Sequence, residues 1–206
     1  MIAVLTGDIV RSTKMSERQY QDLIQLLREH ISTLSNSYQA RGQVYRGDEF
    51  QIHFPDPDFA IKQTILLKLL LITSPVISTP IHCTLSLAFG QHSVMDASPG
   101  TSTGPVYVDS GRKLDTSQRE ALVVTFSDCQ NDPSLTLLTS CISHQLNKLT
   151  QSQAELLHMY IDSDFVEHQK LADKLGTSRQ NISNRLSSMG AHLIRDYIQL
   201  INQKLR

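Results

Sequence analysis

The stretch Ala3-Val4-Leu5-Thr6-Gly7-Asp8-Ile9-Val10-Arg11-Ser12-Thr13 decides how the rest of the chain can be arranged. Its first residues, up to Leu5, are apolar or small and predict a short buried strand. We interpret Gly7 as a residue that stops this strand, and the Ser12-Thr13 pair as a cap for the helix that follows. The stretch therefore predicts a carboxylate, that of Asp8, at the end of a strand.

A second acidic turn lies further along the chain. The segment from Gln43 to Phe54 has the alternation of two strands, with Arg46-Gly47-Asp48 at the tip of a hairpin. If the two strands are neighbours in the sheet, Asp8 and Asp48 converge. Glu49 is predicted to point away from Asp48, so it is an alternative ligand and not an added one. Two carboxylates at adjacent strand ends, beside an incoming helix, suit Mg²⁺ that holds the phosphates of a nucleotide.

These turns resemble those of known families. The Asp8-Ile9-x-x-Ser12-Thr13 turn followed by the Gly47-Asp48 hairpin is similar to the class III nucleotide cyclases, and Gly47-Asp48-Glu49-Phe50 resembles the GGDEF diguanylate cyclases. The segment from Gly104 to Leu114, together with the helical tail, is similar to the SatD family of small bacterial proteins. The resemblance implies that Asp8 and Asp48 bind the metal ion. It also implies a nucleotide or phosphate site at Gly7, Ile9, Ser12, Thr13 and Arg112.

The chain departs from the cyclase pattern at two positions. The cyclases carry a base-selecting lysine four residues before the hairpin aspartate, and Val44 stands there in this chain. They also carry an asparagine and an arginine four residues apart, and aligning that arginine with Arg112 leaves Val108 in place of the asparagine. Losing a hydrogen-bond donor aimed at developing charge costs on the order of hundreds-fold in rate. Arg112 remains a candidate catalytic residue, but we do not expect an efficient cyclase.

Composition predicts an ordinary globular protein. The 206 residues are 40% hydrophobic and 19% charged, with a net charge of -1, so nothing attracts the whole chain to nucleic acid or membrane. Its cysteines, Cys83, Cys129 and Cys141, are far apart and contain no Cys-x-x-Cys pair, which favours reduced thiols. We expect a cytoplasmic protein with no leader peptide and no membrane span.

Residues 1–130 have the pattern of an α+β domain. After the first strand we expect a helix from Ser16 to Tyr38, the Asp48 hairpin, and a helix from Asp58 to about Thr73 that is apolar nearly all round. The remaining elements are a strand at Ile81–Gly90, a loop at Gln91–Gly111 that is a candidate lid, a helix at Arg112–Glu120 and a strand at Ala121–Phe126. This order predicts a ferredoxin-like or nucleotide-cyclase-like, mostly antiparallel sheet with helices on one face.

Residues 134–206 form a second predicted domain, after a linker at Asp128–Ser134. Its patterns are all helical, at Leu135–Leu149, Gln151–Tyr160, Glu167–Leu175 and Ser178 to about Leu205. Within it, Leu171–Leu186 has the features of a helix-turn-helix, because Ala172 permits close helix crossing and Gly176 permits a left-handed turn.

The second helix of this motif is rich in hydrogen-bond donors. No acidic residue occurs between Asp173 and Asp196, which leaves a local basic patch. We predict DNA contacts from Ser178, Arg179, Gln180, Asn181, Asn184 and Arg185. The alternative is a plain helical hairpin that binds protein.

The last helix also predicts a homodimer. Its broad apolar face comprises Leu193, Ile194, Tyr197, Ile198, Ile201 and Leu205. The alternative is that this face folds back on the helix at Leu135–Leu149. The resemblance to the cyclases also favours a homodimer, because cyclase-like sites commonly form between two chains.

Taken together, the patterns favour a nucleotide-responsive, DNA-binding transcriptional regulator whose cyclase-like sensor domain is degenerate. The alternative is an active nucleotidyl cyclase or nucleotidyltransferase whose helical tail has a regulatory or dimerisation role. In a third reading the chain is an interaction protein, and Asp8 and Asp48 are only turn residues.

Overall fold

The computed structural model describes residues 1–45, 47–74, 80–127 and 132–206. The strands are β1 (Ile2–Ile9), β2 (Arg41–Val44), β3 (Glu49–Phe54), β4 (Cys83–Gly90) and β5 (Leu122–Phe126). The helices are α1 (Glu17–Tyr38), α2 (Ala60–Thr73), α3 (Pro105–Thr116), α4 (Pro133–Asn147), α5 (Gln151–Asp162), α6 (His168–Leu175), α7 (Arg179–Ser188) and α8 (Ala191–Lys204). Arg46, Cys129 and most of the predicted linker lie outside the described residues. None of the helices built from the described residues has the length and apolar character needed to cross a bilayer.

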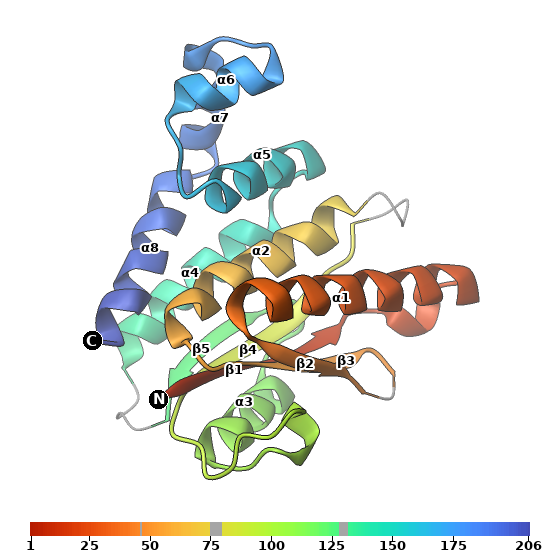
Figure 1. Ribbon diagram of the computed structural model, residues 1–206. Coiled ribbons are helices and arrows are strands. Elements are labelled where there is room, and N and C mark those ends of the chain that lie inside the picture. Colours follow the sequence, from red (N-terminus) through yellow and green to blue (C-terminus); the bar gives the residue numbers. More distant parts are fainter. Residues whose placement is uncertain (46, 75–79, 128–131) are drawn as a thin grey trace.

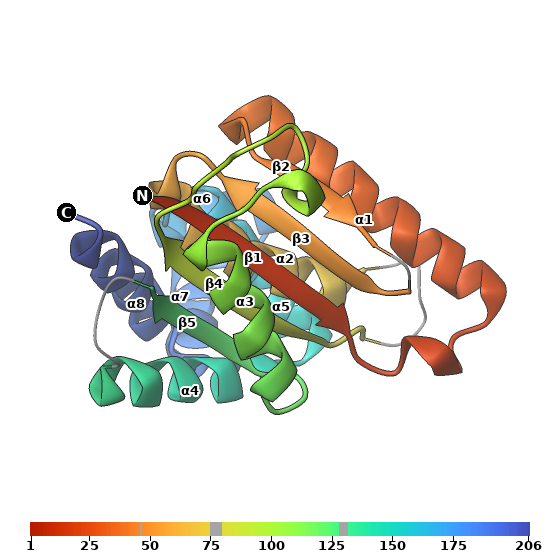
Figure 2. The ribbon, with the colours of Figure 1, turned by 90° about the horizontal axis from the view of Figure 1, so that it is seen from below.

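The strands form one sheet in the order β2-β3-β1-β4-β5 (Figures 1 and 2). Strand β1 pairs antiparallel with both β3 and β4, and β2 pairs antiparallel with β3. Together with α1 and α2, these strands make the βαββαβ unit of ferredoxin-like folds, which confirms the mixed α+β prediction. Strand β5 joins β4 in parallel at the edge of the sheet.

The prediction that the helices cover one face of the sheet is wrong. Figure 1 shows α1 and α2 on one face and α3 on the other. The segment predicted as a loop up to Gly111 ends much earlier, because Gly104 has a φ of 139° and Pro105 starts α3 at a position where proline is favoured. The helix predicted at Arg112–Glu120 is therefore the second half of α3 and the turn after it.

The role of Gly7 also differs from the prediction. Strand β1 continues through Gly7 to Ile9, so this glycine does not stop it. A Cβ at this position would lie 2.3 Å from the ring of Phe50 and 2.8 Å from Leu85. The chain needs glycine here because two large side chains from the neighbouring strands close over it.

Helix α2 explains how the tail is attached. It is apolar nearly all round, and almost every side chain in it is buried, as the sequence predicted. One side of α2 contacts β1 and β4, and its other side is covered by α5, which forms a further layer (Figure 1). Residues of the tail such as Leu157 and Ile161 belong to the same hydrophobic core as Leu5 and Ile65. The described part of the chain therefore shows no separate helix-turn-helix domain.

The predicted last helix is divided in two. Gly190 has a φ of 62° and separates α7 from α8, where the sequence predicted one continuous helix. The apolar face of α8 lies against its own chain, since Tyr197 is buried and its hydroxyl is 2.8 Å from Thr139 Oγ1 on α4. Leu193, by contrast, is half exposed. The predicted dimer seam is thus wrong, and the fold-back alternative holds.

Candidate functional site

The carboxylates predicted from the sequence lie at one end of the sheet. Asp8 is near the end of β1, where it pairs with Glu49 of β3 on one side and Thr84 of β4 on the other. Directly paired residues of antiparallel strands point to the same face, so Asp8 and Glu49 both face the side of the sheet that α3 covers. Asp48 comes immediately before β3, in the turn after β2.

These carboxylates act on one another electrostatically. Burial raises the pKa of Asp8 above its ordinary value, and the negative charge of Asp48 raises it further, while Arg119 lowers it. Burial also raises the pKa of Glu49, and the charges of Asp115, Asp8 and Asp48 add to this effect. Mutual repulsion of this kind is relieved when a cation binds between the groups. We call Asp8, Asp48, Glu49 and Asp115 the carboxylate cluster.

The hairpin next to the cluster is tied to α1. The hydroxyl of Tyr20 donates a hydrogen bond to the carbonyl oxygen of Gly47. Helix α1 is itself held at its start by a capping box, in which Ser16 and Gln19 bond each other's backbone amides. The positions of the Asp48 turn and of the entrance to α1 are therefore linked.

The other predicted nucleotide-binding residues differ in how far their side chains are exposed. Gly7 and Ile9 lie inside β1, and Ile9 is buried in the core. Ser12 and Thr13 belong to a short 3-10 helix, Ser12–Lys14, where Ser12 is buried and Thr13 is exposed. Arg112 is exposed on α3, as is Val108, the residue that replaces the cyclase asparagine.

A pocket of about 350 Å³ opens at the end of β1, and the sequence reading missed it. Arg11, Lys14, His82 and Glu120 contribute to its lining. Arg11 adopts a left-handed conformation with a φ of 64°. Nδ1 of His82 is buried and has no hydrogen-bond partner in the described part of the chain. The signal in the sequence was the pair of basic residues directly after the Asp8 strand. We call this the basic pocket.

The predicted DNA-contacting residues lie at the start of α7, which follows α6 after a short turn. Helix α6 ends at Gly176, which has a φ of 63°, and the Ser178 side chain caps α7 by accepting a hydrogen bond from the Asn181 amide. Arg179, Gln180, Asn181 and Asn184 are exposed, with Gln180 donating to Asn184 at 2.9 Å. Arg185 instead donates to the backbone oxygen and hydroxyl of Ser152 on α5, at 3.2 and 3.0 Å.

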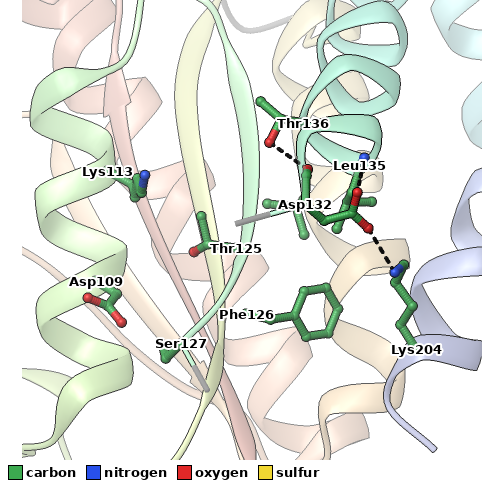
Figure 3. Close-up of a pocket in the computed structure, with 10 residues that line it drawn as sticks. Asp109, Lys113, Thr125, Phe126, Ser127, Asp132, Leu135, Thr136 and Lys204 are labelled. Atoms are coloured by element: carbon green, nitrogen blue, oxygen red, sulfur yellow. Dashed lines mark hydrogen bonds and ion pairs between the residues drawn. The ribbon is translucent and has the colours of Figure 1, made fainter. Parts of the chain in front are cut away.

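A further pocket of about 350 Å³ lies where the sheet meets the tail (Figure 3). Figure 3 shows Asp109 and Lys113 of α3 on one side of β5, with the Phe126 ring on the other side, toward Lys204 of α8. Lys204 forms an ion pair with Asp132 at 3.0 Å, which joins the end of α8 to the start of α4. This pocket shares no residue with the carboxylate cluster or the basic pocket.

Several solved structures of nucleotide cyclase domains are similar to this chain. The adenylyl cyclase CyaB from P. aeruginosa is 15% identical, with a TM-score of 0.47, over 60% of this chain and 75% of that one. The guanylate cyclase domain of RhGC from Catenaria anguillulae, in complex with GTP, is 13% identical, with a TM-score of 0.45, over 60% and 76%. A bacterial light-regulated adenylyl cyclase is 15% identical, with a TM-score of 0.45, over 61% and 74%. No protein-family model and no curated protein matches the chain, so the SatD resemblance stays an expectation.

Proposed function

We propose that this chain binds a nucleoside triphosphate together with Mg²⁺ at the end of β1, with Asp8 and Asp48 as the metal ligands. The observation that carries this proposal is the position of these two carboxylates at neighbouring strand ends, next to the basic pocket. Arg11 and Lys14 supply positive charge for phosphate groups, and the carboxylates supply oxygen ligands for the cation. The turn residues resemble those of the class III nucleotide cyclases, which supports the same assignment.

The donor set fits Mg²⁺ better than a metal bound by protein alone. In the described residues no group of three or more histidine, cysteine, aspartate or glutamate side chains is placed to hold a metal ion. Magnesium usually takes one or two carboxylates and completes its shell with water and substrate phosphates. A bound cation would also offset the repulsion between Asp8 and Asp48. Metal and triphosphate are therefore expected to bind together.

Binding affinity in two variants tests this proposal. Calorimetry with Mg²⁺ and ATP or GTP should show loss of measurable binding in Asp8→Asn and in Asp48→Asn, because each change removes a ligand charge. Glu155→Gln, on the exposed side of α5, is the matched control and should bind as the wild type does. Unchanged affinity in both aspartate variants would leave the carboxylate site without support.

Catalytic turnover is expected to be low. Val44 and Val108 occupy the positions of a base-reading lysine and a transition-state asparagine in the cyclases, so two stabilising groups are missing. Arg112 is the remaining candidate for stabilising developing charge. Incubation of the purified protein with triphosphates should give less than roughly one turnover per second, near the low end of ordinary enzymes. A faster rate would favour the alternative, an active cyclase or nucleotidyltransferase.

DNA binding by the tail is a second candidate function. The observation that favours it is the exposed start of α7, where the side chains of Arg179, Gln180 and Asn181 follow the Ser178 cap. With nucleotide binding, this gives a ligand-responsive transcription regulator. Arg185 is expected to stabilise the fold and not to read bases, because its guanidinium bonds Ser152.

Titrations at several salt concentrations separate these roles. Asn181→Ala should cost about 1 to 3 kcal/mol on a selected duplex, whereas Arg179→Ala should weaken all duplexes and lower the salt slope by about one. If neither variant differs from the wild type on selected or random DNA, the tail does not read DNA. A homodimer remains a prediction, but the buried face of α8 is no longer the expected interface.

A further inference from the structure

The turn between α3 and β5 lies next to Asp8, although it is distant from Asp8 in the sequence. The backbone amide of Glu120 donates a hydrogen bond to Thr84 Oγ1 at 3.0 Å. Thr84 is the residue of β4 that pairs directly with Asp8. Arg119 and Glu120 are therefore placed beside the strand position that carries the proposed metal ligand.

Side chains from α2 and α4 hold this turn in an uncommon conformation. Glu120 has a φ of 67°, in the left-handed region that residues other than glycine rarely adopt. Its carbonyl oxygen accepts a hydrogen bond from Lys68 Nζ of α2 and another from Asn147 Nδ2 of α4, both at 2.9 Å. Nζ of Lys68 also donates to the carbonyl oxygen of Cys83 at 3.0 Å. Side chains from α2 and α4 thus converge on one carbonyl oxygen, and Lys68 also ties it to the start of β4.

The burial of Lys68 is costly, which makes its position informative. Its side chain is only 1% exposed, and in the described part of the chain no carboxylate forms an ion pair with it. Removing an ammonium group from water is strongly unfavourable unless other groups satisfy it. Here the partners are backbone carbonyls at the start of β4 and before β5, so the ammonium group fixes the path of the chain between α3 and β5.

Arg119 is the residue that this arrangement presents to the site. It is exposed, while the next residue in the chain, Glu120, is fixed by the hydrogen bonds described above. Arg119 directly precedes Glu120, whose amide bonds Thr84, the residue that pairs with Asp8. Glu120 also lines the basic pocket, so the turn borders that pocket. An arginine in this position can donate two parallel hydrogen bonds to a phosphate group.

We propose that Arg119 binds the phosphate groups of the nucleotide, and that Lys68 and Asn147 are positioning residues that hold the turn carrying it. This inference rests on the proposed function and adds a residue to it. The chemistry recognised is a polyphosphate bound to a divalent cation. The base of the nucleotide takes no part in the contact.

Binding of inorganic tripolyphosphate with Mg²⁺ tests the role of Arg119 without any base. Arg119→Ala should weaken it by about ten- to a hundredfold, the loss expected for hydrogen bonds to a charged group. Arg119→Lys should recover part of the affinity, because it keeps the charge but loses the paired donors. Arg18→Ala, an exposed arginine of α1, is the control and should behave as the wild type.

A double-mutant cycle tests the positioning role. Lys68→Met keeps an unbranched apolar chain in the core and removes the ammonium group. If Lys68 acts through Arg119, tripolyphosphate binding weakens in Lys68→Met, and adding Arg119→Ala then has little further effect. A purely structural role would give additive losses and would overturn the positioning assignment. Should Lys68→Met fail to fold, Asn147→Ala replaces it in the same cycle.

The results of these binding experiments distinguish failure of the Arg119 proposal from failure of the proposed function. If the wild type binds Mg²⁺ and tripolyphosphate and Arg119→Ala binds equally well, Arg119 is not a phosphate ligand, yet the proposed function stands. If the wild type binds neither tripolyphosphate nor a nucleoside triphosphate, both proposals are wrong.

Discussion

The two faces of the sheet differ in what they bury. On the face toward α1 and α2, residues such as Leu5, Ile52 and Leu87 join a continuous apolar core that extends through α2 into the tail. On the face toward α3, the central positions are polar. Gln51 Nε2 donates to Thr6 Oγ1 at 3.0 Å, and Thr6 Oγ1 lies 2.6 Å from the Ser110 hydroxyl of α3.

The difference indicates that one face mainly stabilises the fold and the other mainly orients the side chains of the site. Apolar burial is non-directional and tolerates some sliding, whereas a buried hydrogen-bond network fixes orientation and is costly when any member is unpaired. The carboxylate cluster lies at one end of the face toward α3. Further along it, α3 is held by Ser110, which donates to the backbone of Ser86, and by Tyr107, whose hydroxyl bonds His53. We infer that the α1/α2 face stabilises the molecule and the α3 face orients its site.

The largest expected effect is on the apolar face. Ile65→Ala, in α2, should lower the free energy of unfolding by about 2 to 5 kcal/mol, because it leaves a cavity at a fully buried position. Val106→Ala, in the small cluster under α3, should cost less. Urea unfolding followed by probes in the sheet and in the tail should give one coincident transition. Equal losses for the two variants would contradict the assignment of stability to one face.

An acid titration compares two histidines, His30 on the α1 side of the sheet and His53 on the α3 side. Burial lowers the pKa of His30 on α1 to about 4, helped by the charge of His158 on α5, and it lowers the pKa of His53 on β3 to about 4 as well. The folded protein keeps both neutral, so their stabilising contribution is present above about pH 6.5 and is lost as pH falls toward 4.

Each histidine adds up to about 1.4 kcal/mol per pH unit to this loss. His30→Gln and His53→Gln should each reduce the slope of unfolding free energy against pH between 6.5 and 4. A slope that neither variant changes would show that other groups cause the acid sensitivity.

The smallest expected effect is the loss of stability on removing either of two buried tyrosine hydroxyls. Tyr107→Phe leaves Nδ1 of His53 without its partner and should cost about 1 to 3 kcal/mol. Tyr197→Phe should cost about 0.5 to 1.5 kcal/mol, because Thr139 keeps a second bond to the Leu135 carbonyl. Only Tyr107→Phe should also weaken triphosphate binding. A loss of binding in both variants would mean that the α3 face has no special role in orienting the site.

The sequence predicted the elements with clear periodicity and failed at positions decided by tertiary contacts. The start of the first helix at Ser16, the hairpin before Glu49 and the all-round burial of α2 are local or compositional signals, and they were predicted correctly. The cap expected from Ser12-Thr13 was wrong, because Ser16 caps α1 and Ser12 lies in a separate 3-10 helix. Gly7 was misread because a strand glycine and a turn glycine look alike until Phe50 and Leu85 are known to close over it.

The residues of the candidate site also divide into those with a local sequence signal and those placed by tertiary contacts. Asp8 and Asp48 stand out by their turns, but Arg119 and Lys68 have no local signal. Their relation to Asp8 depends on which strand pairs with β1 and on a left-handed residue at Glu120. The packing of α5 on α2 could not be predicted either, because an apolar helix does not indicate which other helix packs against it.

Helix α2, enclosed between the sheet and α5, limits how a signal can pass through this molecule. A hinge that swung the tail away would expose an almost wholly apolar helix to water, at a cost no ligand contact could easily offset. If the proposed nucleotide site at the end of β1 acts on α7, we expect the movement to be shear, with α5 sliding over α2 by small steps while the packing between them is preserved.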